Sequence, residues 1–177
     1  MSLTAEREIA SEPQHAPARA ATTPLAAGLS QYGKEYLAFR LGDEEYGIDI
    51  LKVQEIRSYE APTRIAGAPP FMKGVINLRG VIVPVADLRV SMGCKDETIR
   101  PTTCVIVLTV SKRVVGAVVD SVSDVLALTD ADIKPPPEMG ASVADASITG
   151  LATVGQRMLM LIDIEQYMSS SAMQLVD

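Results

Sequence analysis

Side chains suited to catalysis are scarce in this sequence. Its 177 residues include one histidine, His15, which lies in a segment rich in Ala, Thr and Pro, residues 1–30. We expect this segment to be a disordered N-terminal arm, because little in it could bury apolar surface. A catalytic imidazole must be held within hydrogen-bond reach of its partner, which makes His15 a poor candidate. The chain also lacks the glycine-rich phosphate loop, the dinucleotide fingerprint and the Gly-x-Ser-x-Gly nucleophile turn.

Carboxylates are the remaining candidates for chemistry. Asp43, Glu44, Glu45 and Asp49 lie close together but lack the ligand spacing of an EF-hand loop, and such a charge run is typical of a solvated turn. Paired carboxylates could instead act as acid and base in a hydrolase. Sugar-cleaving sites of that kind usually carry aromatic platforms, and the chain has two Phe and five Tyr. We therefore expect no enzymatic activity, no metal and no cofactor, with a carboxylate hydrolase as the alternative.

Composition points to a cytoplasmic protein that does not bind nucleic acid. A formal net charge of −6 and an aromatic content of 4% leave neither a basic surface nor stacking platforms. Cys94 and Cys104 lack the Cys-x-x-Cys spacing, so we expect reduced thiols. No apolar core follows a basic start, as a secretion signal would require. No apolar run approaches the ~18 residues of a membrane-spanning helix.

The elements that would position functional groups follow an internal repeat. Residues 36–47 align with 105–116 without a gap, and residues 74–88 align with 150–164. The repeat units therefore span about 35–90 and 104–165. Because domains of roughly 60 residues are only marginally stable alone, we predict that the two units pack against each other.

Local patterns favour β structure in both units. Residues 37–41 alternate in apolar character, which predicts a strand with Ala38 and Arg40 on a solvent-exposed face. The segment 50–56 is ambiguous and could hold a helical turn, and residues 164–176 predict a short C-terminal helix. We predict an all-β fold of two five-stranded barrels packed together, because closure removes aggregation-prone edges. Such a protein, without catalytic groups, is best suited to binding other proteins.

Three segments resemble one family of bacterial proteins. Residues 41–57 read LGDEEYGIDILKVQEIR, residues 74–89 read GVINLRGVIVPVADLR, and residues 114–125 read VVGAVVDSVSDV. In order and content they closely resemble CheW, the family of chemotaxis coupling proteins. The resemblance implies a CheW-like domain over residues 31–177. It would consist of two intertwined, SH3-like five-stranded barrels, between which terminal strands could be exchanged.

The resemblance also implies a function and partners. Proteins of this family are non-enzymatic adaptors that join the cytoplasmic tips of chemoreceptors (methyl-accepting chemotaxis proteins) to the histidine kinase CheA. They work at receptor arrays on the inner face of the membrane, where rings can include further CheW copies. An adaptor of a non-flagellar chemosensory pathway is a second hypothesis within the same family.

The receptor-binding groove that the resemblance implies comprises Val53, Glu55, Ile56 and Arg79. A helical hairpin would lay apolar side chains on Val53 and Ile56, while the charged groups fix its register. Strand alternation predicts opposite faces for Val53 and Ile56, so that at least one of them packs in the core. For Glu55 and Arg79, a solvated or mutually paired charge is the alternative interpretation.

The kinase contacts that the resemblance implies fall into two groups. The hairpin of the first unit contributes Lys73, Gly74 and Ile82, although Gly74 could equally serve tight backbone geometry. The Pro-rich loop of the second unit contributes Lys134 and Met139, where other members of the family carry Arg and Phe. Lys lacks the bidentate geometry of Arg and Met is softer than an aromatic ring, so this second contact is expected to be weaker.

Overall fold

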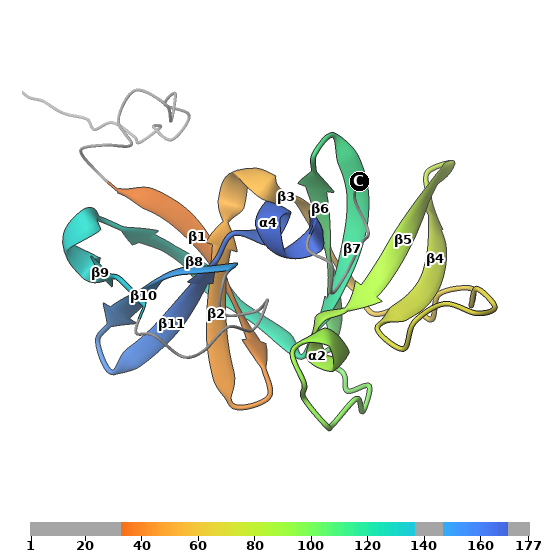
Figure 1. Cartoon of the computed structure of the whole chain (residues 1–177), viewed down its shortest axis with the longest axis horizontal. Coiled ribbons are helices and arrows are strands. Elements are labelled where there is room, and N and C mark those ends of the chain that lie inside the picture. Colours follow the sequence, from red (N-terminus) through yellow and green to blue (C-terminus); the bar gives the residue numbers. More distant parts are fainter. Residues whose placement is uncertain (1–32, 137–146, 170–177) are drawn as a thin grey trace, which may run out of the picture.

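In the computed structural model, which describes residues 33–136 and 147–169, two β-sheets lie beside each other (Figure 1). The predicted all-β fold of two small barrels is confirmed. The predicted N-terminal arm, residue Met139 and the end of the predicted helix 164–176 lie outside the described residues.

The first sheet has six strands in the order β8-β1-β2-β11-β10-β9. Their bounds are β1 (Lys34–Leu41), β2 (Glu44–Asp49), β8 (Ser121–Leu128), β9 (Ile133–Lys134), β10 (Ile148–Val154) and β11 (Arg157–Ile162). Paired strands are antiparallel except β2 and β11, which are parallel. The sixth strand, β9, has two residues and goes beyond the five strands predicted for each barrel.

The second sheet has five strands in the order β3-β6-β7-β5-β4. Their bounds are β3 (Val53–Ser58), β4 (Met72–Leu78), β5 (Val81–Asp87), β6 (Cys104–Val110) and β7 (Arg113–Val119). Here β5 and β7 are the parallel pair. Without β9, the two sheets have the same order of equivalent strands, as expected for a duplicated unit.

Neither sheet is built from one repeat unit alone. Strands β1 and β2 of the first unit pair with β8 and β11 of the second, and β3 and β5 of the first unit pair with β6 and β7 of the second. The chain crosses from one sheet to the other after β2, through a 3-10 turn at Ile50–Lys52. This turn confirms the helical turn considered for residues 50–56.

Two further short elements connect strands, and a third follows the last strand. They are α2 (Leu88–Ser91), the 3-10 turn η3 (Asp130–Asp132) and α4 (Ile164–Ser169). Figure 1 shows α4 between the two sheets, where Ile164, Tyr167 and Met168 are buried. The C-terminal helix thus begins where the sequence predicts it.

The apolar core has three parts. Each sheet encloses a small cluster of its own, and the largest cluster lies between the sheets. The prediction of one solvent-exposed face for β1 is wrong at Ala38, which is fully buried. Because β1 is a central strand, Leu37 and Phe39 face the inter-sheet cluster while Ala38 faces the cluster inside the first sheet.

Two equivalent glycines allow the parallel strands to approach. Gly47 lies opposite Leu161, and Gly116 lies opposite Val85. A Cβ on Gly47 would lie 2.9 Å from Leu161 Cδ2 of β11, and one on Gly116 would lie 3.4 Å from Val85 Cγ2 of β5. The glycines that align in the sequence repeat therefore have the same packing role in both sheets.

Candidate functional site

An ion pair joins two of the four residues predicted to form the receptor groove. Arg79 Nη2 donates to Glu55 Oε2 at 2.5 Å, linking the β4–β5 turn to strand β3. Arg79 and Gly80 form this two-residue turn with φ values of 52° and 88°, the left-handed conformation that suits the twist of a hairpin. Asn77 Oδ1 accepts from the Gly80 N–H at 2.8 Å and so closes the turn. The turn geometry thus positions the Arg79 side chain.

The electrostatics of this pair keep both groups charged. The hydrogen bond from Arg79 is the main reason why the pKa of Glu55 lies below its ordinary value, and Arg57 Nη1, 3.3 Å from Glu55 Oε1, acts in the same direction. Glu55 in turn raises the pKa of Arg79. The alternative of a mutually paired charge is therefore what the structure shows. The Arg79 side chain remains 66% exposed, which leaves it accessible to a partner.

The other two groove residues lie on one face of β3, so the prediction of opposite faces is wrong. The pairing register shifts between Val53 and Glu55, placing Val53 opposite Leu108 and Ile56 opposite Ile106. Such a β-bulge uses one extra residue and reverses the alternation. Val53 is half-buried and packs on the inter-sheet core, whereas Ile56 is 45% exposed. Glu55, the neighbour of Ile56 in the strand, points to the opposite face of the sheet. Val53, Glu55 and Ile56 nevertheless all lie on β3, which is an edge strand of the five-stranded sheet.

The first group of predicted kinase contacts is spread along the β4–β5 hairpin. Ile82 lies near the turn and is 61% exposed. Lys73 lies at the opposite end, where its Nζ is 2.7 Å from Glu97 Oε1. Gly74 is buried with φ 139°, and a Cβ there would lie 2.0 Å from the carbonyl oxygen of Thr63. Close backbone packing by itself therefore explains the glycine at position 74.

The second group lies elsewhere in the fold. Lys134 is the last residue of β9, is exposed and lies opposite Leu151 of β10 in the six-stranded sheet. Met139 lies outside the described residues. The structure therefore does not bring Lys134 together with the β4–β5 hairpin, which belongs to the other sheet.

A second arginine network was missed by sequence reasoning. Arg157 donates to both oxygens of Glu45, at 3.1 and 2.8 Å, and to both oxygens of Asp124, at 3.1 and 2.9 Å. Glu45 belongs to the charge run for which the sequence predicts a solvated turn, yet its side chain is 11% exposed. The sequence signal that could have found it is the strand position of Glu45, immediately before the apolar residues of β2.

The same network argues against a carboxylate hydrolase. Hydrogen bonds from Arg157 hold the pKa values of Glu45 and Asp124 below their ordinary values. A general acid needs a raised pKa near neutral pH, which neither carboxyl has. In the described residues, no group of three or more His, Cys, Asp or Glu side chains is arranged to hold a metal ion. Cys94 and Cys104 are free, and burial raises both thiol pKa values.

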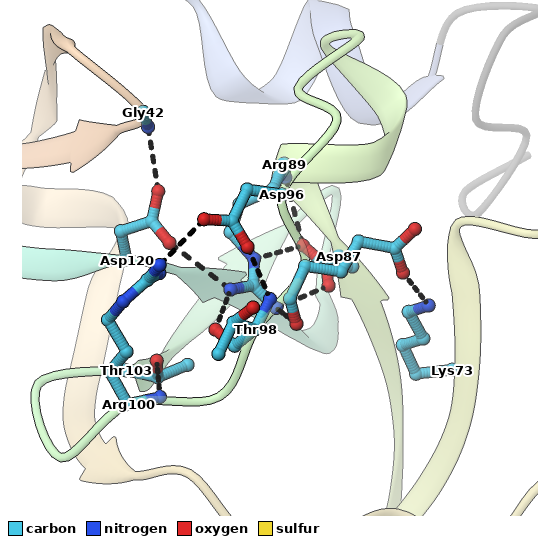
Figure 2. Close-up of polar contacts among 10 residues, drawn as sticks. Gly42, Lys73, Asp87, Arg89, Asp96, Thr98, Arg100, Thr103 and Asp120 are labelled. Atoms are coloured by element: carbon cyan, nitrogen blue, oxygen red, sulfur yellow. Dashed lines mark hydrogen bonds and ion pairs between the residues drawn. The ribbon is translucent and has the colours of Figure 1, made fainter.

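A buried arginine, Arg89, is the other residue that sequence reasoning did not single out. It follows β5 in α2 and is 1% exposed (Figure 2). Its Nε and Nη2 donate to the two carboxylate oxygens of Asp87 at 3.0 and 2.9 Å. Its Nη1 donates to Asp120 Oδ1 at 3.1 Å and to the Thr98 carbonyl at 2.9 Å, and Nη2 also donates to the Glu97 carbonyl at 3.2 Å. These bonds account for all five N–H donors of a guanidinium group.

No helix within residues 33–136 and 147–169 has the length and apolar character that crossing a membrane requires.

Comparison with known proteins gives a consistent result. The family model described as CheW-like domain matches residues 35–172. The chain is 55% identical over 157 residues to "Chemotaxis protein CheW" of Klebsiella aerogenes, covering 89% of this chain and 94% of that one. It is 32% identical to the Bacillus subtilis protein of the same name, covering 80% and 91%. A less similar relative is "Protein FrzA" of Myxococcus xanthus, 28% identical, covering 81% and 90%.

A solved structure has the same fold. The scaffolding protein TtCheW from Thermoanaerobacter tengcongensis superposes with a TM-score of 0.72 at 29% sequence identity, covering 79% of this chain and 95% of that one. The similarity thus extends over both sheets rather than over a single repeat unit.

Proposed function

Because this chain belongs to the CheW-like domain family, whose members are non-enzymatic scaffold proteins of chemotaxis, we propose that it couples chemoreceptor tips to a CheA-type histidine kinase. The observation that carries the proposal is the accessible Glu55–Arg79 pair on the edge strand that also exposes Ile56. In this proposal the adaptor works in the cytoplasm, at receptor arrays beneath the membrane.

The proposed receptor face is suited to a helical partner. Ile56 offers exposed apolar surface on the edge strand β3, and Val53 of the same strand packs on the inter-sheet core. A helix presents apolar side chains at one face, and these could cover Ile56. The Glu55–Arg79 ion pair, on the other face of the same edge strand, can exchange its internal hydrogen bonds for bonds to polar residues of the partner, which sets register more than affinity.

The proposed kinase face is the β4–β5 hairpin. Val81 and Ile82 are 53% and 61% exposed at its tip, and Lys73 lies at its other end. Exposed aliphatic residues at a hairpin tip favour burial against another protein. A second ring contact, with the kinase or with another copy of this chain, would use Lys134 on the other sheet and Met139, so one molecule could contact two neighbours.

Binding measurements with purified partners test both faces. We expect Arg79→Glu to weaken receptor-tip binding at least about tenfold, because it places a second negative charge beside Glu55 and removes the arginine from the proposed contact. The charge-swapped double variant Glu55→Arg/Arg79→Glu restores the internal pair and serves as its control for folding. Unchanged receptor affinity in Arg79→Glu would contradict the receptor face.

The kinase face has a matched control in the duplicated unit. Ile82→Asp should weaken binding of the kinase regulatory domain at least about tenfold by placing an unpaired charge in an apolar contact. Met158→Asp changes the equivalent hairpin position of the other sheet, where Met158 is 59% exposed, and should leave that affinity nearly unchanged. If the wild-type protein binds neither partner, the adaptor function itself is wrong.

A further inference from the structure

The segment that joins the two repeat units, residues 93–103, contacts the proposed kinase face. Glu97 in this segment accepts a hydrogen bond from Lys73 Nζ at 2.7 Å. The backbone of the same residue is held from the opposite side, because its carbonyl accepts from Arg89 Nη2 at 3.2 Å. Figure 2 shows Arg89 at the centre of this arrangement and Lys73 at its edge. One residue of the segment therefore connects the buried arginine to the half-buried lysine.

Other contacts shape the segment without attaching Glu97 to a sheet. Asp96 accepts from the Thr98 N–H at 2.9 Å and from Arg100 Nη2 at 2.6 Å. Thr103 Oγ1 accepts from the Arg100 N–H at 2.8 Å. These bonds close local turns within the segment. The bonds from Arg89 to the Glu97 and Thr98 carbonyls instead fasten it to the end of β5.

Arg89 is itself fixed from both sheets. Asp87, the last residue of β5, binds its guanidinium through both carboxylate oxygens. Asp120, between β7 and β8, accepts from Arg89 through Oδ1 and from the Gly42 N–H of the β1–β2 turn through Oδ2 at 2.7 Å. Contacts from both barrels therefore fix the position of the Arg89 guanidinium. Its hydrogen bond to the Glu97 carbonyl in turn fixes the Glu97 backbone.

We propose that Arg89 is a positioning residue for the kinase face: by holding the Glu97 backbone, it places the Glu97 carboxylate against Lys73 and so sets where the lysine ammonium lies. This inference rests on the proposed function, since it gives Lys73 its part in kinase binding. The Lys73 and Glu97 side chains are 30% and 48% exposed, and an ion pair that accessible adds little stability. What Arg89 controls is thus the position of the ammonium group.

The Arg89→Lys variant tests whether the hydrogen-bond geometry of Arg89, rather than its positive charge, positions Glu97. Lysine keeps the positive charge between Asp87 and Asp120, but its single ammonium has three N–H donors and lacks the planar fork that reaches both carbonyls. Glu97→Gln weakens the same chain one step further out by removing the carboxylate charge, at a partly exposed side chain where the change should not affect folding. Arg100→Gln removes the Arg100–Asp96 ion pair of the same segment and is the matched control.

The first test measures Lys73 directly. The reactivity of its amine towards reductive methylation, followed by peptide mass spectrometry, should rise at least about threefold in both variants. In Arg89→Lys the partner carboxylate is no longer held in place, and in Glu97→Gln the partner loses its charge. Arg100→Gln should react like the wild type. Wild-type reactivity of Lys73 in Arg89→Lys, or no change in Glu97→Gln, would overturn the positioning role.

The second test measures the consequence for binding. Arg89→Lys should weaken kinase-domain binding about five-fold, and Glu97→Gln by a similar factor, while receptor-tip affinity changes less than about two-fold. The double variant should show little further loss, since both substitutions act through Lys73. If Arg89→Lys lowers the melting temperature but changes both affinities equally, Arg89 is only structural. If the wild type binds no kinase domain, the proposed function fails, and Lys73 reactivity alone decides whether Arg89 positions the lysine.

Discussion

Two arginines hold equivalent acidic residues in the two sheets, but with different consequences. Glu55 of β3 and Asp124 of β8 occupy matching positions, opposite Val107 and Ala38 respectively. Arg79 holds Glu55 from an exposed turn, whereas Arg157 binds Asp124 and Glu45 with four hydrogen bonds. Arg157 thus uses four of its five N–H donors within its own chain, whereas the Arg79 side chain is 66% exposed and can still donate to a partner. This asymmetry supports placing the proposed receptor face on the five-stranded sheet.

The Arg157 network predicts an acid-sensitive contribution to stability. In the folded state, the hydrogen bonds from Arg157 lower the pKa of Glu45 below its ordinary value of 4.5. The ionised Glu45 carboxylate therefore contributes its full stabilisation above pH 4.5. This contribution declines as the pH falls through the folded-state pKa. We expect Glu45→Gln to reduce the free energy of unfolding by about 1–2 kcal/mol at pH 7.

Chemical denaturation at several pH values checks this. The difference between wild type and Glu45→Gln should shrink as the pH falls below 4.5. Glu60→Gln, at an exposed carboxylate, should show almost no difference at any pH. A Glu45→Gln difference that stays constant from pH 7 to strongly acidic conditions would show that Glu45 is not stabilised by its charge.

At the scale of elements, the hairpin turns determine where functional groups lie. Arg79 and Gly80 turn β4 into β5, and Ser111 and Lys112 turn β6 into β7, both with positive φ values at the two central residues. Glycine adopts such angles without strain, whereas Lys112 at φ 67° does not. The first turn therefore has one residue under backbone strain, Arg79, whose side chain also binds Glu55. The second turn has two strained residues, Ser111 and Lys112.

Relieving the strain at Lys112 should stabilise the protein. We expect Lys112→Gly to raise the free energy of unfolding by about 0.5–1 kcal/mol, because the left-handed conformation then costs less. Lys112→Ala removes the same charge but keeps the strain, and serves as the control. Denaturant titration of the wild type and both variants measures the three free energies of unfolding. Equal stabilisation by Lys112→Gly and Lys112→Ala would show that loss of the lysine charge, rather than relief of backbone strain, is the cause.

At the scale of the whole molecule, strand exchange makes the two barrels interdependent. Strands β1 and β2 complete a sheet that otherwise belongs to the second repeat unit, while β6 and β7 complete the other. The inter-sheet cluster is the largest of the three cores. Any change in the angle between the barrels would disturb this cluster, so the proposed receptor and kinase faces on the five-stranded sheet keep a fixed relation to Lys134 on the other sheet. A rigid relation of this kind suits a scaffold.

This interdependence predicts that neither repeat unit folds alone. A fragment ending at residue 103 lacks the strands that β1 and β3 pair with, β8 and β6. We expect it, and the complementary fragment from 104, to show no cooperative thermal transition by circular dichroism, since each would expose most of the shared core. Mixing the two should restore the transition. A cooperative transition in one fragment alone would disprove the interdependence.

The sequence by itself determined the element types, the duplication and the family. Matching glycines at 47 and 116, and matching hairpins, predicted two similar β units because strand and turn propensities are local properties. Only the tertiary structure decided which strands share a sheet, since the parallel pairing of β2 with β11 and β5 with β7 joins distant segments. It also decided the face of Ile56, because a single-residue bulge in β3 reverses the alternation, and it gathered the contacts of Arg89, whose acceptors come from separate parts of the chain.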